Sequence, residues 1–146
     1  EFSPAAEATA AGIGTRIVTL GGAALIIDYG DWRSLGDTLQ AVRGHEHADP
    51  LAQPGEADLT AHVDFEALAR AARPCAHSRL TPQGVFLERL GITQRAQTLA
   101  RGLTGTELET HIAAHRRLTH PAEMGTLFKA MALFPKTATP PPGLDA

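Results

Sequence analysis

A continuous apolar run, Ala23-Ala24-Leu25-Ile26-Ile27, constrains the fold most, because it directly follows the two glycines Gly21 and Gly22. The run ends in Asp28-Tyr29-Gly30 and is too short for a buried helix. Its length and composition favour a strand covered on both faces, as in a parallel sheet. Ahead of the glycines, Ser3-Pro4 is typical of a helix start, and an amphipathic stretch continues to about Leu20. Helix, glycine turn and buried strand form one unit of a wound α/β fold.

The remaining elements are marked mainly by caps and by glycine or proline. We expect a long, loop-rich connection over 31–58 with one short strand in Thr38–Arg43. We then expect a helix over Phe65–Ala72 capped by Asp64, a short strand within Cys75–Leu80 and a helix over Gln83–Leu90. The last predicted elements are helices over Gln94–Arg101 and Glu107–Leu118, capped by Thr93 and by a Thr106/Glu109 capping box, a turn or short helix after His120-Pro121, and a strand over Leu127–Phe134. This gives three or four strands in an order that begins with a helix. A wound sheet normally has five or six strands and opens with a strand and a glycine-rich turn, so the first half of the fold is missing from this prediction.

Charge and composition exclude several classes of protein. Thirteen Lys and Arg stand against sixteen Asp and Glu, and only 5% of residues are aromatic, which argues against nucleic-acid binding. The longest apolar run is far below the ~20 residues that span a bilayer. The single cysteine, Cys75, excludes an internal disulfide, and Glu1-Phe2-Ser3-Pro4 carries no signal or transit pattern, so a reducing, cytoplasmic compartment is expected.

The polar residues that follow the apolar run are the best-placed candidates for a site. Ligands of open α/β sheets bind beyond the carboxyl ends of the strands, where Asp28, Tyr29 and Gly30 lie. The alternative is that Asp28 caps the next turn and Tyr29 packs on the sheet edge. The polar segment from Gly36 to Asp64 would either cover this end as a lid or form an ordinary surface excursion.

Three other patterns do not predict a site. His45-x-His47 with Asp49, and the Glu107, His111 and His115 series, lack an assured third metal ligand, so we predict no metal site and interpret the helical series as a solvated stripe ending in Arg116-Arg117. Gly12-Ile13-Gly14 lacks the third glycine of a nucleotide-binding loop and follows no strand. Cys75 has only His77 as a possible activating neighbour and is interpreted as a small buried hydrophobe.

Several short motifs occur together, in order, over nearly the whole chain. They are Glu1-Phe2-Ser3-Pro4-Ala5-Ala6-Glu7, Gly22-Ala23-Ala24-Leu25-Ile26-Ile27-Asp28-Tyr29-Gly30, Asp37-Thr38-Leu39-Gln40-Ala41, Ala57-Asp58-Leu59-Thr60-Ala61-His62-Val63-Asp64-Phe65, Thr81-Pro82-Gln83-Gly84-Val85-Phe86-Leu87 and Met124-Gly125-x-Leu127-Phe128-Lys129-Ala130. Each is weak alone, but the combination resembles the MidA family. These are S-adenosylmethionine-dependent methyltransferases related to a mitochondrial complex I assembly factor.

The resemblance implies the C-terminal half of a Rossmann-like class I methyltransferase. Residues 1–136 would belong to that domain, with a helical insertion at about 82–120 and a solvated, Pro-rich tail at 137–146. The family's cofactor-binding turn and ribose-binding acid would precede this chain. No cofactor-binding residue is therefore assigned here, and the chain alone is expected to be inactive, although the complete protein would use S-adenosylmethionine.

The resemblance also implies a substrate class. The mitochondrial member is associated with arginine methylation of a complex I subunit, which would make the partner a protein substrate. Asp28, with Asp58 or Asp64, would orient and neutralise a guanidinium on which Tyr29 stacks, while Gly30 and Arg43 are further cleft candidates. No catalytic residue is assigned. The compartment would be the bacterial cytoplasm, or the mitochondrial matrix in a eukaryote. The alternative function is a non-enzymatic assembly module that docks through Gln94 to Leu118.

Overall fold

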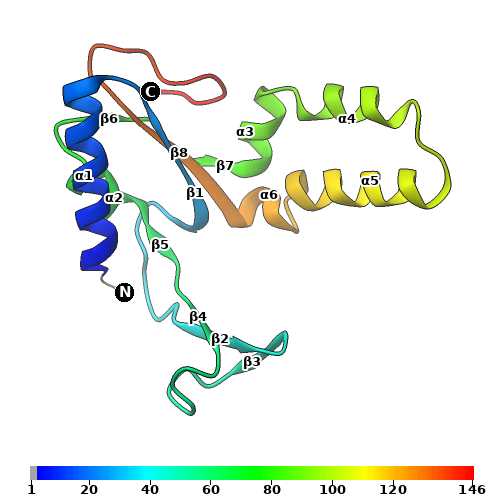
Figure 1. Ribbon diagram of the computed structural model, residues 1–146, viewed down its shortest axis with the longest axis horizontal. Helices are drawn as coiled ribbons and strands as arrows, with labels where there is room; N and C mark the ends of the chain where they lie inside the picture. The colour runs from blue at the N-terminus through cyan, green and yellow to red at the C-terminus, as the bar shows by residue number, and fades with distance from the viewer. Residues whose placement is uncertain (1–2) are drawn as a thin grey trace.

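The structure is a computed structural model that describes residues 3–146, so the first two residues of the N-terminal motif, Glu1 and Phe2, lie outside it. Helix α1 (Pro4–Leu20) begins and ends where the sequence predicts (Figure 1). The Ala6 N–H donates to Ser3 Oγ over 3.4 Å, which confirms Ser3 as the N-cap. Gly21 ends the helix with φ of 77°, a left-handed value that glycine adopts without strain.

The main sheet has five strands and confirms the α/β class. The strands are β1 (Ala24–Asp31), β5 (Val63–Asp64), β6 (Ala76–His77), β7 (Thr81–Pro82) and β8 (Phe128–Phe134). The order is β5-β1-β8-β6, with β7 also paired to β8. Strand β8 runs antiparallel to β1, β6 and β7, whereas β5 pairs with β1 in parallel through two residues only. The prediction of a purely parallel neighbourhood for the apolar strand is therefore wrong.

The prediction that β1 is covered on both faces is also wrong for this chain. Ile26 packs against the core, but Leu25 and Ile27 point the other way and are 49% and 42% exposed. Alternate side chains of a strand point to opposite faces, so the face of β1 that carries Leu25 and Ile27 is partly open. Among residues 3–146, no strand pairs with the edge of Ala24–Tyr29 that lies opposite β8.

Helices α1 and α2 (Phe65–Ala71) cover the other face of the sheet. Phe65, Met131 and Leu133 have no more than 2% of their surface exposed and form the centre of this core. The Gly12-Ile13-Gly14 segment lies inside α1. This agrees with the prediction that it is not a nucleotide-binding loop. A Cβ at Gly14 would meet the backbone of Ala72, so this glycine allows the two helices to approach closely.

Cys75 belongs to the same core, as predicted. Its Sγ–H donates to the Gly14 carbonyl over 3.3 Å, which fixes the thiol between α1 and the end of α2. Burial raises the pKa of the Cys75 thiol, which favours its protonated form.

A small antiparallel sheet projects from the body and is called the β arm, residues 40–60. It contains β2 (Gln40–Arg43), β3 (Glu46–Ala48) and β4 (Asp58–Thr60) in the order β3-β2-β4 (Figure 1). The predicted short strand in Thr38–Arg43 is confirmed, but the expectation of loop elsewhere is wrong at β3 and β4. Gly44 and His45, both with positive φ, form the two-residue turn of a hairpin between β2 and β3.

Four helices follow the strand β7. They are α3 (Gln83–Arg89), α4 (Ile92–Ala100), α5 (Gly105–Thr119) and α6 (Met124–Leu127). Helices α4 and α5 lie side by side as a projecting helical hairpin (Figure 1). The predicted caps are wrong, because α4 begins after Gly91 and α5 after Thr104. None of the described helices is both long and apolar enough to span a membrane.

The C-terminal segment is exposed over 137–139, as the prediction of a solvated tail requires, but it is anchored near its end. Leu144 is buried in a cluster with Phe86 and Phe134. The Arg79 N–H donates to the Asp145 carbonyl over 2.8 Å, and Arg89 forms a 2.8 Å ion pair with the Asp145 carboxylate. The chain turns back at Pro140-Pro141-Pro142, and Leu144, which follows these prolines, packs against the body. The prediction of a solvated tail considered the prolines and not this apolar side chain.

Candidate functional site

A hollow of about 320 Å³ lies at the carboxyl end of β1, where the strand-end rule places a ligand. It is lined by Tyr29, Thr38, Gln40, Thr60, His62 and Leu127. These residues come from β1, the base of the β arm, the connection to β5, and α6. We call this the Tyr29 hollow. Most of its lining groups are polar, while Tyr29, His62 and Leu127 also offer flat or apolar surface.

Tyr29 is held by two aromatic neighbours. Its ring meets Phe128 edge to face, with centroids 5.5 Å apart and an interplanar angle of 87°. The His62 ring lies 6.0 Å away at 70°. Edge contacts of this kind fix a ring while leaving part of its surface open. The His62 N–H also donates to Thr38 Oγ1 over 3.0 Å, and this bond ties the two sides of the hollow together.

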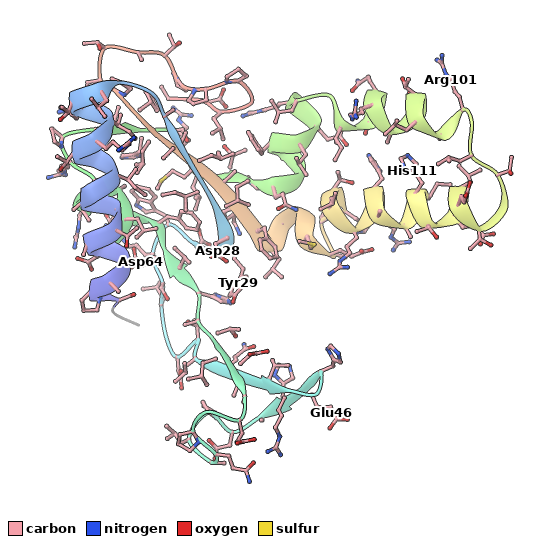
Figure 2. All side chains as sticks on the ribbon, viewed as in Figure 1. Asp28, Tyr29, Glu46, Asp64, Arg101 and His111 are labelled. Carbon is pink, nitrogen blue, oxygen red and sulfur yellow. The ribbon has the colours of Figure 1, made fainter. Side chains whose placement is uncertain are left out.

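Asp28 lies next to the hollow, with its carboxylate turned toward its own backbone. Its Oδ1 accepts a 2.8 Å hydrogen bond from the Tyr29 N–H; both residues are labelled in Figure 2. Because β1 continues to Asp31, this contact lies within the strand and caps no turn, so the turn-capping alternative is wrong. The opposite residue on β8 is Lys129, whose Nζ donates to the carbonyls of Gly30 (3.2 Å) and Thr126 (2.7 Å). An ionised carboxylate accepts about four hydrogen bonds, so Asp28 retains capacity for a ligand.

Gly30 has a structural role at the same strand end. It is buried with φ of 152°, and a Cβ there would fall onto the Val63 carbonyl oxygen. Only glycine therefore allows β5 to come close enough to pair with β1.

The other predicted residues lie elsewhere. Arg43 and Asp58 belong to the β arm, where the Arg43 guanidinium donates to the Gln53 side chain and Asp58 is paired with Val42 across β2 and β4. Asp64 caps α2, as predicted: its Oδ1 accepts from the Ala67 N–H at 2.9 Å and its Oδ2 from the Ser34 N–H at 3.3 Å. Of the six predicted residues only Tyr29 lines the hollow, Asp28 and Gly30 are its neighbours along β1, and the other three lie elsewhere.

The helical histidines pack inside the helical hairpin, so their interpretation as a solvated stripe is wrong. His111 Nε2 lies 2.9 Å from the Ala96 carbonyl, and His115 Nε2 lies 3.1 Å from Thr93 Oγ1. Within residues 3–146, no three His, Cys, Asp or Glu side chains are grouped to hold a metal ion.

The five lining residues that the sequence did not single out are Thr38, Gln40, Thr60, His62 and Leu127. Four of them lie in the polar segment between Gly36 and Asp64 that was proposed as a lid, and that position is the signal that points to them. Gln40 faces Thr60 across β2 and β4, a pairing that depends on the unpredicted strand β4.

Residues 1–84 match a family described as S-adenosyl-L-methionine-dependent methyltransferases. The chain belongs to this methyltransferase family. It is 41% identical over 124 residues to the protein arginine methyltransferase NDUFAF7 homolog, mitochondrial, of Drosophila melanogaster, and 36% identical over 152 residues to the NDUFAF7 protein of Xenopus laevis. These matches cover 82% and 97% of the chain but 28% and 35% of the relatives, so the chain spans about a third of their length. The resemblance to the MidA family is confirmed.

Solved structures agree with this assignment. A Burkholderia thailandensis protein described as a likely methyl transferase bound to S-adenosyl-homocysteine is 30% identical, with a TM-score of 0.73 over 97% of this chain and 37% of that one. A second, uncharacterised protein from the same organism gives a TM-score of 0.77 at 29% identity, over 99% of this chain and 39% of that one. The fold is thus that of part of a methyltransferase of this family.

S-adenosyl-L-methionine is the cofactor of the family. Such sites in wound α/β folds use a glycine-rich turn between a strand and a helix. Gly12 and Gly14 lie within α1, and Gly21 and Gly22 lead from a helix into a strand. Neither pair of glycines lies in a turn that leads from a strand into a helix.

Proposed function

We propose that this chain is the C-terminal part of an S-adenosylmethionine-dependent protein arginine methyltransferase linked to respiratory complex I assembly. The Tyr29 hollow would be one wall of its substrate cleft. The observation that carries the proposal is a hollow at the carboxyl end of β1, with polar groups on five of its six lining residues, in a chain 41% identical to a protein arginine methyltransferase. The compartment would be the bacterial cytoplasm or, in a eukaryote, the mitochondrial matrix.

The chemistry of the hollow suits a guanidinium group. Arginine presents five N–H donors in a rigid plane, so its site needs several acceptors and a flat surface. Thr38, Thr60 and Gln40 carry side-chain oxygens at the hollow. Tyr29 offers a ring for a cation–π contact. Asp28, the preceding residue of β1, is not part of the lining, and its carboxylate would supply negative charge from outside the hollow.

The rest of the methyltransferase would supply the cofactor site. The relatives are about three times longer than the matched region, and the open face of β1 is where further elements of a wound sheet would pack. We therefore expect this chain alone to bind no S-adenosylmethionine in a calorimetric titration. Saturable one-to-one binding by the chain alone would contradict this division of roles.

The test of the substrate cleft uses the longer polypeptide with an arginine-containing protein substrate. Asp28→Asn should lower methyl transfer by at least roughly tenfold, because the charge beside the guanidinium is lost while the shape is kept. Asp58→Asn, an equal change in the β arm, should leave the rate unchanged. Normal turnover by Asp28→Asn would remove Asp28 from the site, and circular dichroism would show that both variants are folded.

A second candidate function is that of a docking module. The helical hairpin projects from the body and exposes Leu99 and Ile112, and such apolar side chains on a projecting element are suited to a protein partner. Two variants distinguish the docking function from the methyltransferase function. Ile112→Glu should abolish docking to a complex I subunit without altering methylation of a free peptide, whereas Asp28→Asn should do the reverse.

A further inference from the structure

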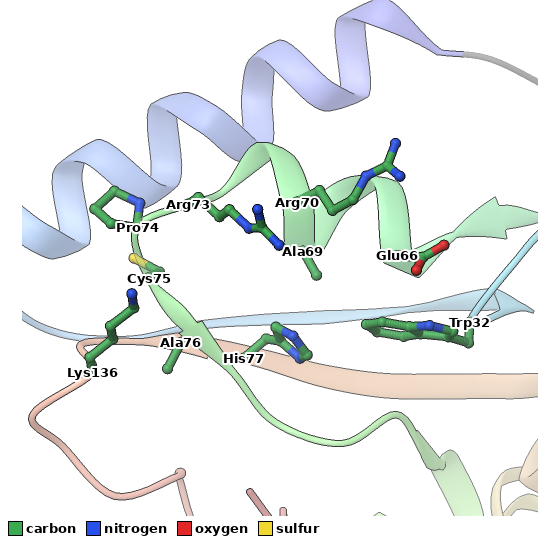
Figure 3. Close-up of a pocket in the computed structure, with 10 residues that line it drawn as sticks. All are labelled: Trp32, Glu66, Ala69, Arg70, Arg73, Pro74, Cys75, Ala76, His77 and Lys136. Carbon is green, nitrogen blue, oxygen red and sulfur yellow. The ribbon is translucent and has the colours of Figure 1, made fainter.

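A second hollow, of about 480 Å³, lies beside β6 and has a different chemical character (Figure 3). Arg70 and Arg73, from α2 and the turn after it, form one wall. Lys136, which follows β8, contributes a third cation, and Trp32 and His77 form the opposite wall. No residue lines both this hollow and the Tyr29 hollow. We call it the Trp32 hollow.

The positive charges of the Trp32 hollow are not neutralised within the described chain. Glu66 also lines the hollow, but both of its oxygens accept hydrogen bonds from Arg33, at 2.7 and 3.0 Å. Among residues 3–146, no hydrogen bond or ion pair engages the side chains of Arg73 and Lys136, and Arg70 interacts only at longer range with Glu66. Three cations therefore surround one hollow in which the single carboxylate already has a partner.

The opposite wall offers a flat aromatic surface. The Trp32 and His77 rings lie with centroids 5.3 Å apart and planes inclined by 35°. His77 Nδ1 lies 3.0 Å from the Ser78 carbonyl, which fixes the imidazole in this orientation. Cationic side chains and exposed aromatic rings are the two kinds of group that recognise a phosphate and a base.

We propose that the Trp32 hollow binds a mononucleotide, with the phosphate on the wall formed by Arg70 and Arg73, the base against Trp32 and His77, and Lys136 adding positive charge at one end. Guanidinium groups bind phosphate oxygens in pairs, and three cations beside a single, already paired carboxylate suit a dianionic ligand better than a ligand with one carboxylate. The volume lies within the range of roughly 300–1,000 Å³ that is typical of small-molecule sites. The hollow borders β6, the outer strand of the sheet, and is separated from the open edge of β1 by β8.

The test uses the only tryptophan of the chain, which lies in the hollow. Adenosine monophosphate should change Trp32 fluorescence saturably, and equilibrium dialysis with radiolabelled nucleotide should give the same Kd. Adenosine and inorganic phosphate should each bind at least roughly tenfold more weakly, because each reaches only one of the two surfaces. Raising the salt concentration should weaken nucleotide binding.

Two double variants of equal charge complete the experiment. Arg70→Gln with Arg73→Gln should weaken nucleotide binding at least roughly tenfold, since two phosphate contacts are lost. Arg101→Gln with Arg117→Gln removes two exposed cations of the helical hairpin and should have no effect. Equal affinity of adenosine and its monophosphate, unchanged binding by the first variant, or no binding in dialysis at about 10 mM, where even weak sites are occupied, would overturn the proposal. None of these outcomes depends on methyltransferase activity.

Discussion

The sheet body (α1, α2 and the main sheet) and the helical hairpin (α4 and α5) are held by different forces. In the body, Phe65, Met131 and Leu133 are almost fully shielded from water. In the helical hairpin no residue is buried, and α4 meets α5 through partly exposed histidines that contact a carbonyl and a hydroxyl. Burial of apolar surface supplies most of the stability of a domain, so the hairpin should open locally at lower free energy than the body.

The largest effect should come from the centre of the body. Phe65→Ala removes a ring with 0% exposure and should lower the free energy of unfolding by about 3–5 kcal/mol, measured by chemical denaturation. Leu59→Ala, at a side chain of the β arm that is 60% exposed, is the control and should stay within about 0.5 kcal/mol. Similar losses for the two variants would show that the body lacks a separate core.

The next largest effect should come from the close approach of β1 and β5. Gly30→Ala should lower stability by about 1–3 kcal/mol, because the new Cβ meets the Val63 backbone in a strained conformation. Gly12→Ala is the matched control, since Gly12 lies in α1 with open space around it. There the same change should raise stability by about 0.5–1 kcal/mol. A neutral Gly30→Ala would mean that β5 does not pair with β1 in solution.

The two parts also differ in their helix caps. Asp64→Ala should cost about 1 kcal/mol, because the carboxylate caps α2 and holds the Ser34 N–H. Thr104→Ala at the start of α5 should cost much less, because the Thr104 side chain makes no capping hydrogen bond. Thermal unfolding of both variants measures this difference, and an equal loss would show that Thr104 caps α5 in solution.

The exposed surface of the helical hairpin should contribute little to folding. Ile112→Ala changes a side chain that is 56% exposed, so stability should shift by no more than about 0.5 kcal/mol. Hydrogen exchange of α5 amides provides a second, local measurement. A large loss of protection would mean that Ile112 is covered in solution and that the hairpin is not a free arm.

The smallest effect should come from the surface pair beside the Trp32 hollow. The hydrogen bond from Arg33 lowers the pKa of Glu66, so this carboxylate is more acidic in the folded chain. Its contribution is therefore present above the unfolded pKa and is lost as the pH falls through the folded value. Arg33→Gln should return the Glu66 pKa toward its ordinary range, measured by NMR titration. An unchanged titration would show that the pair does not persist in solution.

Elements with local signals could be predicted from the sequence. Ser3-Pro4 marks the start of α1, and Asp64 marks the start of α2, because a cap acts within four residues of its own position. Strands β3 and β4 were missed, since each is three residues long and is stabilised by pairing with β2 rather than by its own composition.

The same distinction applies to the site. Tyr29 was predicted because the end of a strand can be recognised from local sequence, and ligands of open α/β sheets bind beyond the carboxyl ends of the strands. His62 and Leu127 reach the same hollow through the register of β5 and β8, and no local pattern carries that information. The Trp32 hollow was not predicted for the same reason, since its cations come from two segments more than sixty residues apart.

The half-open strand β1 has a consequence for the behaviour of this chain in solution. Its unpaired edge carries free backbone N–H and C=O groups beside the exposed side chains of Leu25 and Ile27. An apolar strand with an open edge is a template for pairing with another chain, and proteins ordinarily protect such edges with charges, prolines or covering elements. No charged residue or proline occurs between Ala23 and Ile27. Self-association through β1 is therefore the main hazard when this chain is handled alone at high concentration.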